Sequence, residues 1–402
     1  MKIADSTLAG RGKLSHEWAA GRMAIIKKIA AKNPGALAGI KLGVCLHVTK
    51  ETSVLVMAAK KLGADIAVCS ANPLSAQDDI AAYLVENGVG VFAWQGETQR
   101  EYKRCISDVL AFRPMIITDD GGDLHTAAHR AGIRGIAGGT EETTSGVKRL
   151  TAFEKAGKLR YPVMAVNNAR TKYLFDNRHG TGQSTLDGIL RSTDMFFPGS
   201  HVVVCGYGWV GKGVAMRARG MGAIVTVTEV DPIKALEAKM DGFEVAPLAK
   251  AVRSGDLFIT CTGQTGVIRK EHFAKMKDGA ILANAGHFDI EIDVSYLYRS
   301  CRPVKVRPGV ERFIVNGRKL HVLSEGRVVN LIAAEGHPPE VMALSFANQL
   351  LAILHVAKNH DKLEAKVHGI PERVDEQVAW YSLAAMGVSI DSPTREQSRY
   401  QQ

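Results

Sequence analysis

The stretch HVVVCGYGWVG at residues 201–211 decides the fold of this chain. An apolar run typical of a buried strand leads directly into Gly206, Gly208 and Gly211, which have the G-x-G-x-x-G spacing of a dinucleotide-binding loop. The residues that follow have the pattern of an amphipathic helix. Strand, glycine loop and helix in this order predict the first βα unit of a Rossmann-type fold.

A carboxylate in the right place strengthens this prediction. The next apolar run, AIVTVT at 223–228, ends at Glu229, and Asp231 follows closely. A carboxylate here accepts hydrogen bonds from the adenosine ribose hydroxyls, and two of them repel a 2′-phosphate. The pattern therefore favours NAD over NADP, although a tight turn without a cofactor remains the alternative. The residues expected at this cofactor are Gly206, Gly208, Val210, Gly211 and Glu229.

Apolar and amphipathic segments alternate on both sides of the glycine loop, which is typical of mostly parallel sheets covered by helices. We therefore predict an α/β protein with two doubly wound parallel-sheet domains and a short C-terminal arm. Expected strands lie at 39–48, 64–71, 88–94, 114–119, 133–139 and 162–167, and then at 201–205, 223–230, 257–263 and 279–286. Expected helices lie at 51–62, 75–87, 98–112 and 125–132, and then at 210–220, 233–240, 246–253 and 270–276.

A long apolar segment at 338–358 has helical spacing and is expected to return the chain from the second domain to the first. The predicted division is therefore a substrate-binding domain from 1–183 and 336–368 around an NAD-binding domain at 184–335. The charged residues 369–402 form the predicted terminal arm.

Composition narrows the class of protein. The chain has 402 residues and a formal net charge of +10, but its lysines and arginines are dispersed, so nucleic acid is not the expected partner. The N-terminus lacks the apolar core of a signal peptide, and no run reaches the ~18 uninterrupted apolar residues of a membrane span. Six cysteines without a C-x-x-C pair predict reduced thiols and a cytoplasmic location.

Polar clusters interrupt the first domain where its predicted strands end. In open α/β sheets, ligands bind at this carboxyl edge. Each cluster alone is compatible with a turn or a helix cap, but their repetition favours a site. The clusters are HVTKET at 47–52, DDGGD at 119–123, EETT at 141–144 and NNARTK at 167–172, followed by FDN at 175–177.

Taken together, these motifs resemble the S-adenosyl-L-homocysteine hydrolase (adenosylhomocysteinase) family from about residue 39 to the C-terminus. The variants of several motifs, and the short arm, resemble its archaeal and thermophile-type branch. The matching stretches are LHVTKET, NPLSAQDD, FAWQGET, DDGGDL, EETTSGV, TKYLFDNRHGTGQST, GYGWVGKG, TEVDP, GHFDIEID, EGRVVNL and EGHPPEVM.

The resemblance implies a reversible hydrolysis of S-adenosyl-L-homocysteine to adenosine and homocysteine. NAD oxidises C3′ of the ribose, and the ketone makes the C4′ proton removable. Homocysteine then leaves by elimination, water adds, and the hydride returns, so that NAD is recycled. The family also implies a homotetramer.

The resemblance also implies the roles of individual residues, and it implies no metal. The expected catalytic residues are His47, Asp120, Lys172, Asp176 and His287. Burial is expected to lower the pKa of Lys172, so that it can act as a base on the 3′-hydroxyl. The expected substrate ligands are Thr49, Glu51, Glu142 and His337, and the remaining NAD ligands are Thr143, Thr144, Ser145, Asn177, Thr262 and Asn330.

Departures from the family pattern leave alternatives open. Asn168 replaces a usual aspartate, and Arg170 and Ala76 are also unusual. Glu51 can accept from N6 of adenine or from N1–H of hypoxanthine, with Lys50 as a donor to O6, so S-inosyl-L-homocysteine is an alternative substrate. The same chemistry with water as the leaving group would make a nucleoside dehydratase. An NAD-sensing regulatory subunit is the non-enzyme alternative.

Overall fold

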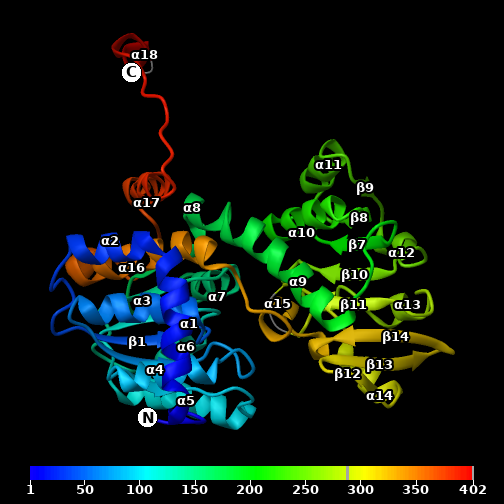
Figure 1. Cartoon of the computed structure of the whole chain (residues 1–402), viewed down its shortest axis with the longest axis horizontal. Coiled ribbons are helices and arrows are strands. Elements are labelled where there is room, and N and C mark those ends of the chain that lie inside the picture. The colour runs from blue at the N-terminus through cyan, green and yellow to red at the C-terminus, as the bar shows by residue number, and fades with distance from the viewer. Residues whose placement is uncertain (287–288, 401–402) are drawn as a thin grey trace.

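Two parallel-dominated sheets lie side by side in the computed structural model, which describes residues 1–286 and 289–400 (Figure 1). The first sheet has the strand order β15-β6-β5-β4-β1-β2-β3, and every strand pair in it is parallel. The second has the order β12-β13-β14-β11-β10-β7-β8-β9. These sheets confirm the predicted fold class.

Helices cover both faces of the first sheet. One face packs against α1 to α4 and α16, and the other packs against α5 to α7. Its strands are β1 (Lys41–Cys45), β2 (Asp65–Cys69), β3 (Gly90–Phe92), β4 (Ile116–Asp119), β5 (Gly138–Glu141), β6 (Val163–Ala165) and β15 (Val367–Gly369). Its helices are α1 (Ala9–Arg22), α2 (Ala24–Lys32), α3 (Lys50–Lys61), α4 (Asp78–Glu86), α5 (Gln99–Ala111), α6 (Asp123–Arg130), α7 (Thr144–Lys155) and α16 (Pro339–Asn359).

The order of the first sheet creates a topological switch point between β1 and β4. The chain leaves β1 toward β2 on one side and returns to β4 on the other, so the connections after β1 and β4 diverge. Polar side chains that follow these two strands therefore meet at one carboxyl edge. This edge holds the clusters that begin at His47 and Asp119.

The second sheet repeats this design. Its parallel strands have the order β9-β8-β7-β10-β11-β14, so a switch point lies between β7 and β10. The strands are β7 (His201–Cys205), β8 (Ile224–Thr228), β9 (Glu244–Val245), β10 (Leu257–Thr260), β11 (Ile281–Asn284), β12 (Val304–Arg307), β13 (Val310–Val315) and β14 (Arg318–Leu323). The helices are α9 (Thr181–Thr193), α10 (Trp209–Gly220), α11 (Pro232–Met240), α12 (Leu248–Ala251), α13 (Lys270–Phe273), α14 (Val294–Ser300) and α15 (Val329–Ile332).

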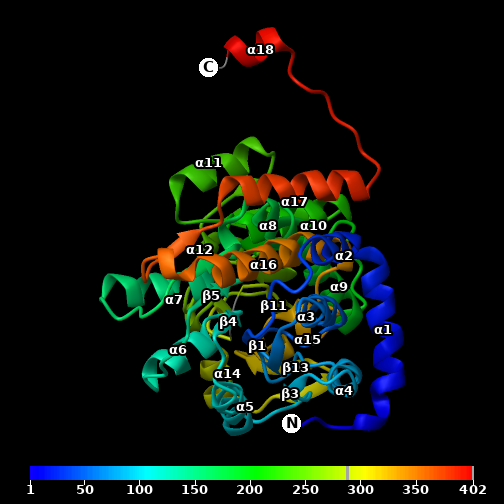
Figure 2. The same cartoon turned by 90° about the vertical axis from the view of Figure 1, so that its left-hand side faces the viewer.

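Some elements differ from the sequence-based prediction. The fifth predicted strand, at 133–139, is shifted to Gly138–Glu141, because Gly135 adopts a positive φ of 86° and the chain extends only beyond it. The antiparallel strands β12 and β13 were not predicted. Helix α17 (Glu372–Ala385) belongs to the predicted arm, but it packs against α16 and α2. Only the chain beyond α17, with α18 (Arg395–Tyr400), extends away from the body (Figures 1 and 2).

Helix α16 lies against the first sheet unit (Figure 2). It contacts α2, α3 and β5, and its inward face includes Phe346, Leu350 and Ile353. By length and composition alone, it is the one described helix that could cross a membrane, but 61% of its apolar window is buried inside the fold. Such burial is typical of a core helix. All six cysteines are described and free, in agreement with the prediction of reduced thiols.

A buried histidine beside the carboxyl end of β4 predicts acid sensitivity. Burial lowers the pKa of His125 to about 3, from the ordinary 6.5. Between these values the folded protein binds fewer protons than the unfolded chain. Stability is therefore lost as pH falls through this window, by about 1.4 kcal/mol per pH unit. Urea unfolding measured from neutral pH downward should show this slope, and His125→Gln should flatten it. Equal slopes in both proteins would contradict the assignment.

Candidate active site

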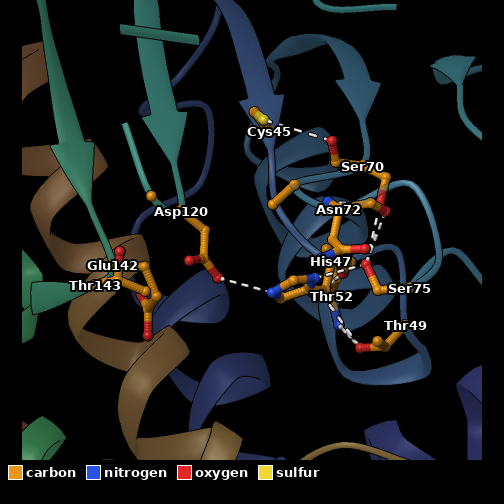
Figure 3. Close-up of polar contacts among 12 residues, drawn as sticks. Cys45, His47, Thr49, Thr52, Ser70, Asn72, Ser75, Asp120, Glu142 and Thr143 are labelled. Atoms are coloured by element: carbon orange, nitrogen blue, oxygen red, sulfur yellow. Dashed lines mark hydrogen bonds and ion pairs between the residues drawn. The ribbon is translucent and has the colours of Figure 1, made fainter. Parts of the chain in front are cut away.

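His47 and Asp120 face each other across the switch point of the first sheet (Figure 3). His47 Nε2 lies 3.5 Å from Asp120 Oδ2, and His47 Nδ1 lies 2.6 Å from the Ser75 hydroxyl oxygen. Burial lowers the pKa of His47, although Asp120 opposes this effect. The imidazole is therefore neutral at pH 7, and it can accept or donate a proton beside a carboxylate.

A second cluster surrounds Lys172 on the short helix α8 (Arg170–Tyr173). Lys172 Nζ lies 2.9 Å from Asp176 Oδ1, 2.8 Å from Asn177 Oδ1 and 3.6 Å from Glu142 Oε1. Asp176 begins a π-helical turn, Asp176–Gly180, that carries both its own side chain and Asn177 toward the lysine. The side chains of Lys172 and Asp176 are only 4% and 6% exposed, so this ion pair is shielded from water.

The protonation state of Lys172 corrects one expectation. Burial alone would lower the pKa of Lys172, but the carboxylates of Asp176 and Glu142 outweigh burial and raise it. The prediction of a lowered lysine pKa was therefore wrong for the ligand-free protein, because it considered burial without the partners. Burial raises the pKa of Glu142 to about 7, against the effect of Lys172. Of this cluster, Glu142 is thus the group whose pKa is matched to neutral pH.

His337 joins the cluster from the segment between α15 and α16. Its Nδ1 lies 3.2 Å from Asp176 Oδ2, and its Nε2 lies 3.2 Å from the Thr181 hydroxyl oxygen. Burial of Asp176 is outweighed by Lys172 and His337, which lower its pKa. His337 also acts electrostatically on His47. The two clusters therefore form one site within the first sheet unit, which the segments 1–183 and 336–368 build together.

The C-terminal helix α17 fixes the start of α8. Asp375 accepts hydrogen bonds from the backbone N–H groups of Arg170 and Thr171, at 2.6 and 2.8 Å, and also from the Thr171 hydroxyl. The Arg170 and Asn168 side chains are exposed. The exposed Asn168 side chain is therefore not part of the lysine cluster. Its neighbour Asn167 is connected to the cluster, because Asn167 Oδ1 accepts a hydrogen bond from Asn177 Nδ2 at 3.2 Å.

The expected purine ligands lie at the start of α3. Glu51 is 2% exposed, and burial raises its pKa. Lys50 Nζ lies 3.4 Å from Glu51 Oε1 and 3.2 Å from Glu335 Oε2. A cavity of about 160 Å³ opens beside them, lined by Thr49, Ala76 and, among others, residues 331, 332 and 334–336. A small side chain at position 76 thus faces a space that a ligand can enter.

The glycine loop fits a dinucleotide. Gly206 has a φ of 101°, and a Cβ on Gly211 would lie 2.0 Å from the carbonyl oxygen of Gly206, so the tight turn requires both glycines. A Cβ on Gly208 would meet nothing within 4 Å, which leaves open space beside the N-terminus of α10. Glu229 accepts from the Tyr207 N–H at 2.7 Å, so its carboxylate lies at the loop. A pyrophosphate and a ribose diol fit this arrangement.

The other expected NAD ligands come from both sheet units. Asn330 is buried, and its amide oxygen has no hydrogen-bond partner among the described residues, as expected for a group that awaits a ligand donor. Thr143 is the N-cap of α7, and its hydroxyl oxygen lies 3.3 Å from that of Ser145. The Thr144 side chain is exposed. Thr262 donates to Glu291 through its backbone and its hydroxyl.

The structure also reveals participants that the sequence reasoning missed. Ser345 on α16 donates to Glu142, and Ser75 contacts His47. Ser75 lies within the quoted motif NPLSAQDD, but nothing in the sequence distinguishes its role there. Asp375 and Ser345 lie about 200 residues from their partners, so no local pattern identifies them. His287, an expected catalytic residue, lies outside the described residues.

A dinucleotide loop in Rossmann strand order, beside a second doubly wound sheet with a buried acid–base cluster, defines a two-sheet NAD-dependent enzyme. A family model described as S-adenosyl-L-homocysteine hydrolase matches residues 1–134. The model of the NAD binding domain of S-adenosyl-L-homocysteine hydrolase matches residues 177–336. The chain belongs to the S-adenosyl-L-homocysteine hydrolase family, and its cofactor is NAD.

Several relatives match over nearly the whole chain. An adenosylhomocysteinase from Sulfurisphaera tokodaii is 53% identical, covering 99% of this chain and 97% of the relative. One from Aeropyrum pernix is 52% identical, covering 100% and 98%. An S-inosyl-L-homocysteine hydrolase from Methanocaldococcus jannaschii is 49% identical, covering 99% and 98%. Relatives named for an adenosyl and for an inosyl substrate are thus almost equally similar to this chain. Overall sequence identity therefore does not decide which purine the chain binds.

Proposed function

We propose that the chain catalyses the NAD-dependent, reversible hydrolysis of S-adenosyl-L-homocysteine to adenosine and homocysteine. The observation that carries this proposal is one site in which the buried Lys172–Asp176 pair and the partly buried His47–Asp120 pair interact through the charge of Asp120. The first pair suits alcohol chemistry at C3′, and the second suits proton transfer at C4′ and C5′. The similarity to the archaeal adenosylhomocysteinases supports this substrate.

Bound NAD supplies a hydride acceptor, and later a hydride donor, for C3′ of the ribose. Lys172 is positioned to hold the 3′-oxygen as an ammonium and to stabilise the negative charge that develops there. The 3′-hydroxyl proton passes to the coupled cluster of Lys172, Asp176 and Glu142, in which the pKa of Glu142, about 7, is suited to accept it. On re-reduction, the same cluster returns a proton to the 3′-oxygen.

His47 and Asp120 perform the second half of the chemistry. After C3′ is a ketone, one of the pair removes the C4′ proton, and the other assists departure of the sulfur from C5′. The neutral state of His47 allows it to accept a proton first and to donate it in the reverse step. Thr49 and Glu51 bind the purine edge, and His287 completes the leaving-group side.

The two sheet units divide these tasks. Residues 1–183 and 336–368 bind the nucleoside, and residues 184–335 bind NAD through Thr262, Asn330 and the glycine loop. Thr143, Thr144, Ser145 and Asn177 bind NAD from the first unit. Helix α9 and the segment after α15 join the units (Figure 1). Closure of the cleft about these connections would keep water from the keto intermediate.

The test is mass-spectrometric turnover by purified, NAD-loaded protein with S-adenosyl-L-homocysteine, S-inosyl-L-homocysteine and a panel of free nucleosides side by side. Release of homocysteine and adenosine is the expected result. Loss of water from a free nucleoside, with both thioethers intact, would overturn the proposal in favour of a nucleoside dehydratase. NAD binding without turnover of any nucleoside would indicate a regulatory subunit.

A second candidate substrate, S-inosyl-L-homocysteine, is favoured by the charge pattern around Lys50. Its ammonium lies beside the buried carboxylate of Glu51, so an acceptor and a donor are adjacent. N1–H of hypoxanthine can donate to Glu51 while O6 accepts from Lys50. The similarity to the S-inosyl-L-homocysteine hydrolase of Methanocaldococcus jannaschii supports this substrate.

Lys50→Met is therefore expected to lower kcat/KM for the inosyl thioether by about tenfold, the effect of one lost hydrogen bond, and to change the adenosyl value less. Lys61→Met, at the exposed end of the same helix, is the matched control. Steady-state kinetics with both thioethers gives the comparison. An equal decrease in kcat/KM for the two thioethers would show that Lys50 does not distinguish hypoxanthine from adenine.

We also propose a cytoplasmic homotetramer without nucleic-acid or membrane partners. Exposed apolar side chains on α1 and α17 offer surfaces for self-association, with Trp18 58% and Trp380 55% exposed. The free thiols suit a reducing compartment. Light scattering after gel filtration measures the mass, and a monomer would contradict the assembly.

A further inference from the structure

We propose that Glu141, which no part of the mechanism above uses, is a neutral, protonated carboxylic acid that positions the two reactive carboxylates, Asp120 and Glu142. This inference rests on the proposed function, in which both neighbours face the ribose. Glu141 is a positioning residue, because it acts through the backbone beside them and does not touch the substrate.

One carboxyl oxygen of Glu141 accepts three hydrogen bonds. Glu141 Oε1 accepts from the Gly121 N–H at 2.9 Å, from the Thr143 N–H at 2.9 Å and from the Thr143 hydroxyl at 2.8 Å. Gly121 directly follows Asp120, and Thr143 directly follows Glu142. One oxygen therefore ties together the loops after β4 and β5, and with them the backbone that carries both reactive carboxylates.

The surroundings of Glu141 disfavour a negative charge. Its side chain is fully buried at the end of β5, and Asp119 is its register partner at the end of β4. The carboxyl oxygens of these two residues lie within 4.8 Å of each other. Burial, followed by the charges of Asp119 and Asp120, raises the pKa of Glu141 well above its usual range.

The position of the proton follows from the free oxygen. Glu141 Oε2 is buried and has no hydrogen-bond partner among the described residues, which costs more for an ionised carboxylate than for a neutral hydroxyl. Both Asp119 oxygens already accept backbone N–H groups, those of Asp120 and His125, at 2.9 and 2.8 Å. All three donors to Glu141 reach Oε1 alone, whereas each Asp119 oxygen has its own donor. Burial raises the pKa of Asp119 to about 7, whereas the pKa of Glu141 is raised well above its usual range, so the negative charge is better placed on Asp119 and the proton on Glu141.

The same neighbourhood has the ligand types of a metal site, because Asp119, His125 and Glu141 converge. Both nitrogens of His125 are engaged, with the Tyr161 hydroxyl at 3.0 Å and the Thr140 carbonyl at 3.2 Å. A cation would have to displace these contacts and those of Asp119. A proton on Glu141 requires no such displacement, so the geometry favours the protonated acid over a cation.

The test compares Glu141→Gln with Glu141→Ala in NAD-loaded, full-length protein. Glutamine keeps an acceptor at Oε1 and supplies N–H groups where the proton lies, so kcat should stay within about threefold of the wild type. Alanine releases both loops, and kcat should fall about 10²-fold with a shifted pH profile of kcat/KM. Gly146→Ala offers a second route, because its Cβ would lie 2.1 Å from the Glu141 carboxyl carbon and displace it.

An infrared difference spectrum, wild type minus Glu141→Gln, reads the proton directly. A carbonyl band of a protonated carboxylic acid that is lost in the variant supports the proposal. Its absence, an equal loss of activity in the glutamine and alanine variants, or a stoichiometric bound metal would overturn it. The infrared band does not depend on turnover. If the wild type cleaves neither thioether, the proposed function is wrong, but the infrared spectrum still shows whether Glu141 is protonated.

Discussion

Lys172→Ala is expected to lower turnover of the nucleoside thioether by about 10³-fold, within the range for loss of a proton-transfer group. The variant removes the ammonium at the 3′-oxygen and leaves Asp176 and Glu142 as adjacent buried carboxylates. Their mutual repulsion raises both pKa values, so the cluster no longer stabilises a negative 3′-oxygen. Single-turnover absorbance of the reduced cofactor measures the oxidation step directly.

Lys158→Ala is the matched control, because this lysine is exposed on the loop after α7. It should retain wild-type turnover and bound NAD. Circular dichroism and NAD content of the Lys172→Ala protein separate a chemical defect from misfolding. Full 3′-oxidation by a folded, NAD-loaded Lys172→Ala variant would show that the oxidising pair has been assigned wrongly.

Gly211→Ala is expected to weaken NAD binding by about 100-fold or more. This corresponds to a loss of about 2–3 kcal/mol of binding free energy, as expected when several backbone N–H donors are displaced. The new Cβ would lie 2.0 Å from the Gly206 carbonyl oxygen, so the backbone of the loop must move. The N–H groups at the start of α10 then no longer converge on the pyrophosphate. NAD content after gel filtration, and titration calorimetry of the stripped protein, measure the effect.

Gly220→Ala provides the control in the same helix. A Cβ at this position would meet nothing within 4 Å, and alanine is the better helix former. NAD retention should therefore match the wild type. Equal retention by Gly211→Ala and Gly220→Ala would mean that the glycine loop does not bind the dinucleotide.

Local sequence patterns were sufficient for most of the fold. The four strands predicted in the second sheet correspond to β7, β8, β10 and β11. Each was predicted from a short apolar run, a pattern that depends only on neighbouring residues. The strands β12 and β13 were not predicted. Strand β12 is exposed along its whole length and β13 is partly exposed, so their hydrophobic pattern is weak, and β13 is stabilised mainly by pairing with β14, which was not predicted either.

The sequence by itself determined two doubly wound sheets, the NAD loop and the residue types at the strand ends, because these depend on spacing along the chain. Only the tertiary structure decided how those residues act together. The raised pKa of Lys172 arises from carboxylates on two segments, and Asp375 reaches α8 from more than 200 residues away. A side chain's charge state depends on the burial and charges around it, and these are set by which segments pack together rather than by sequence order.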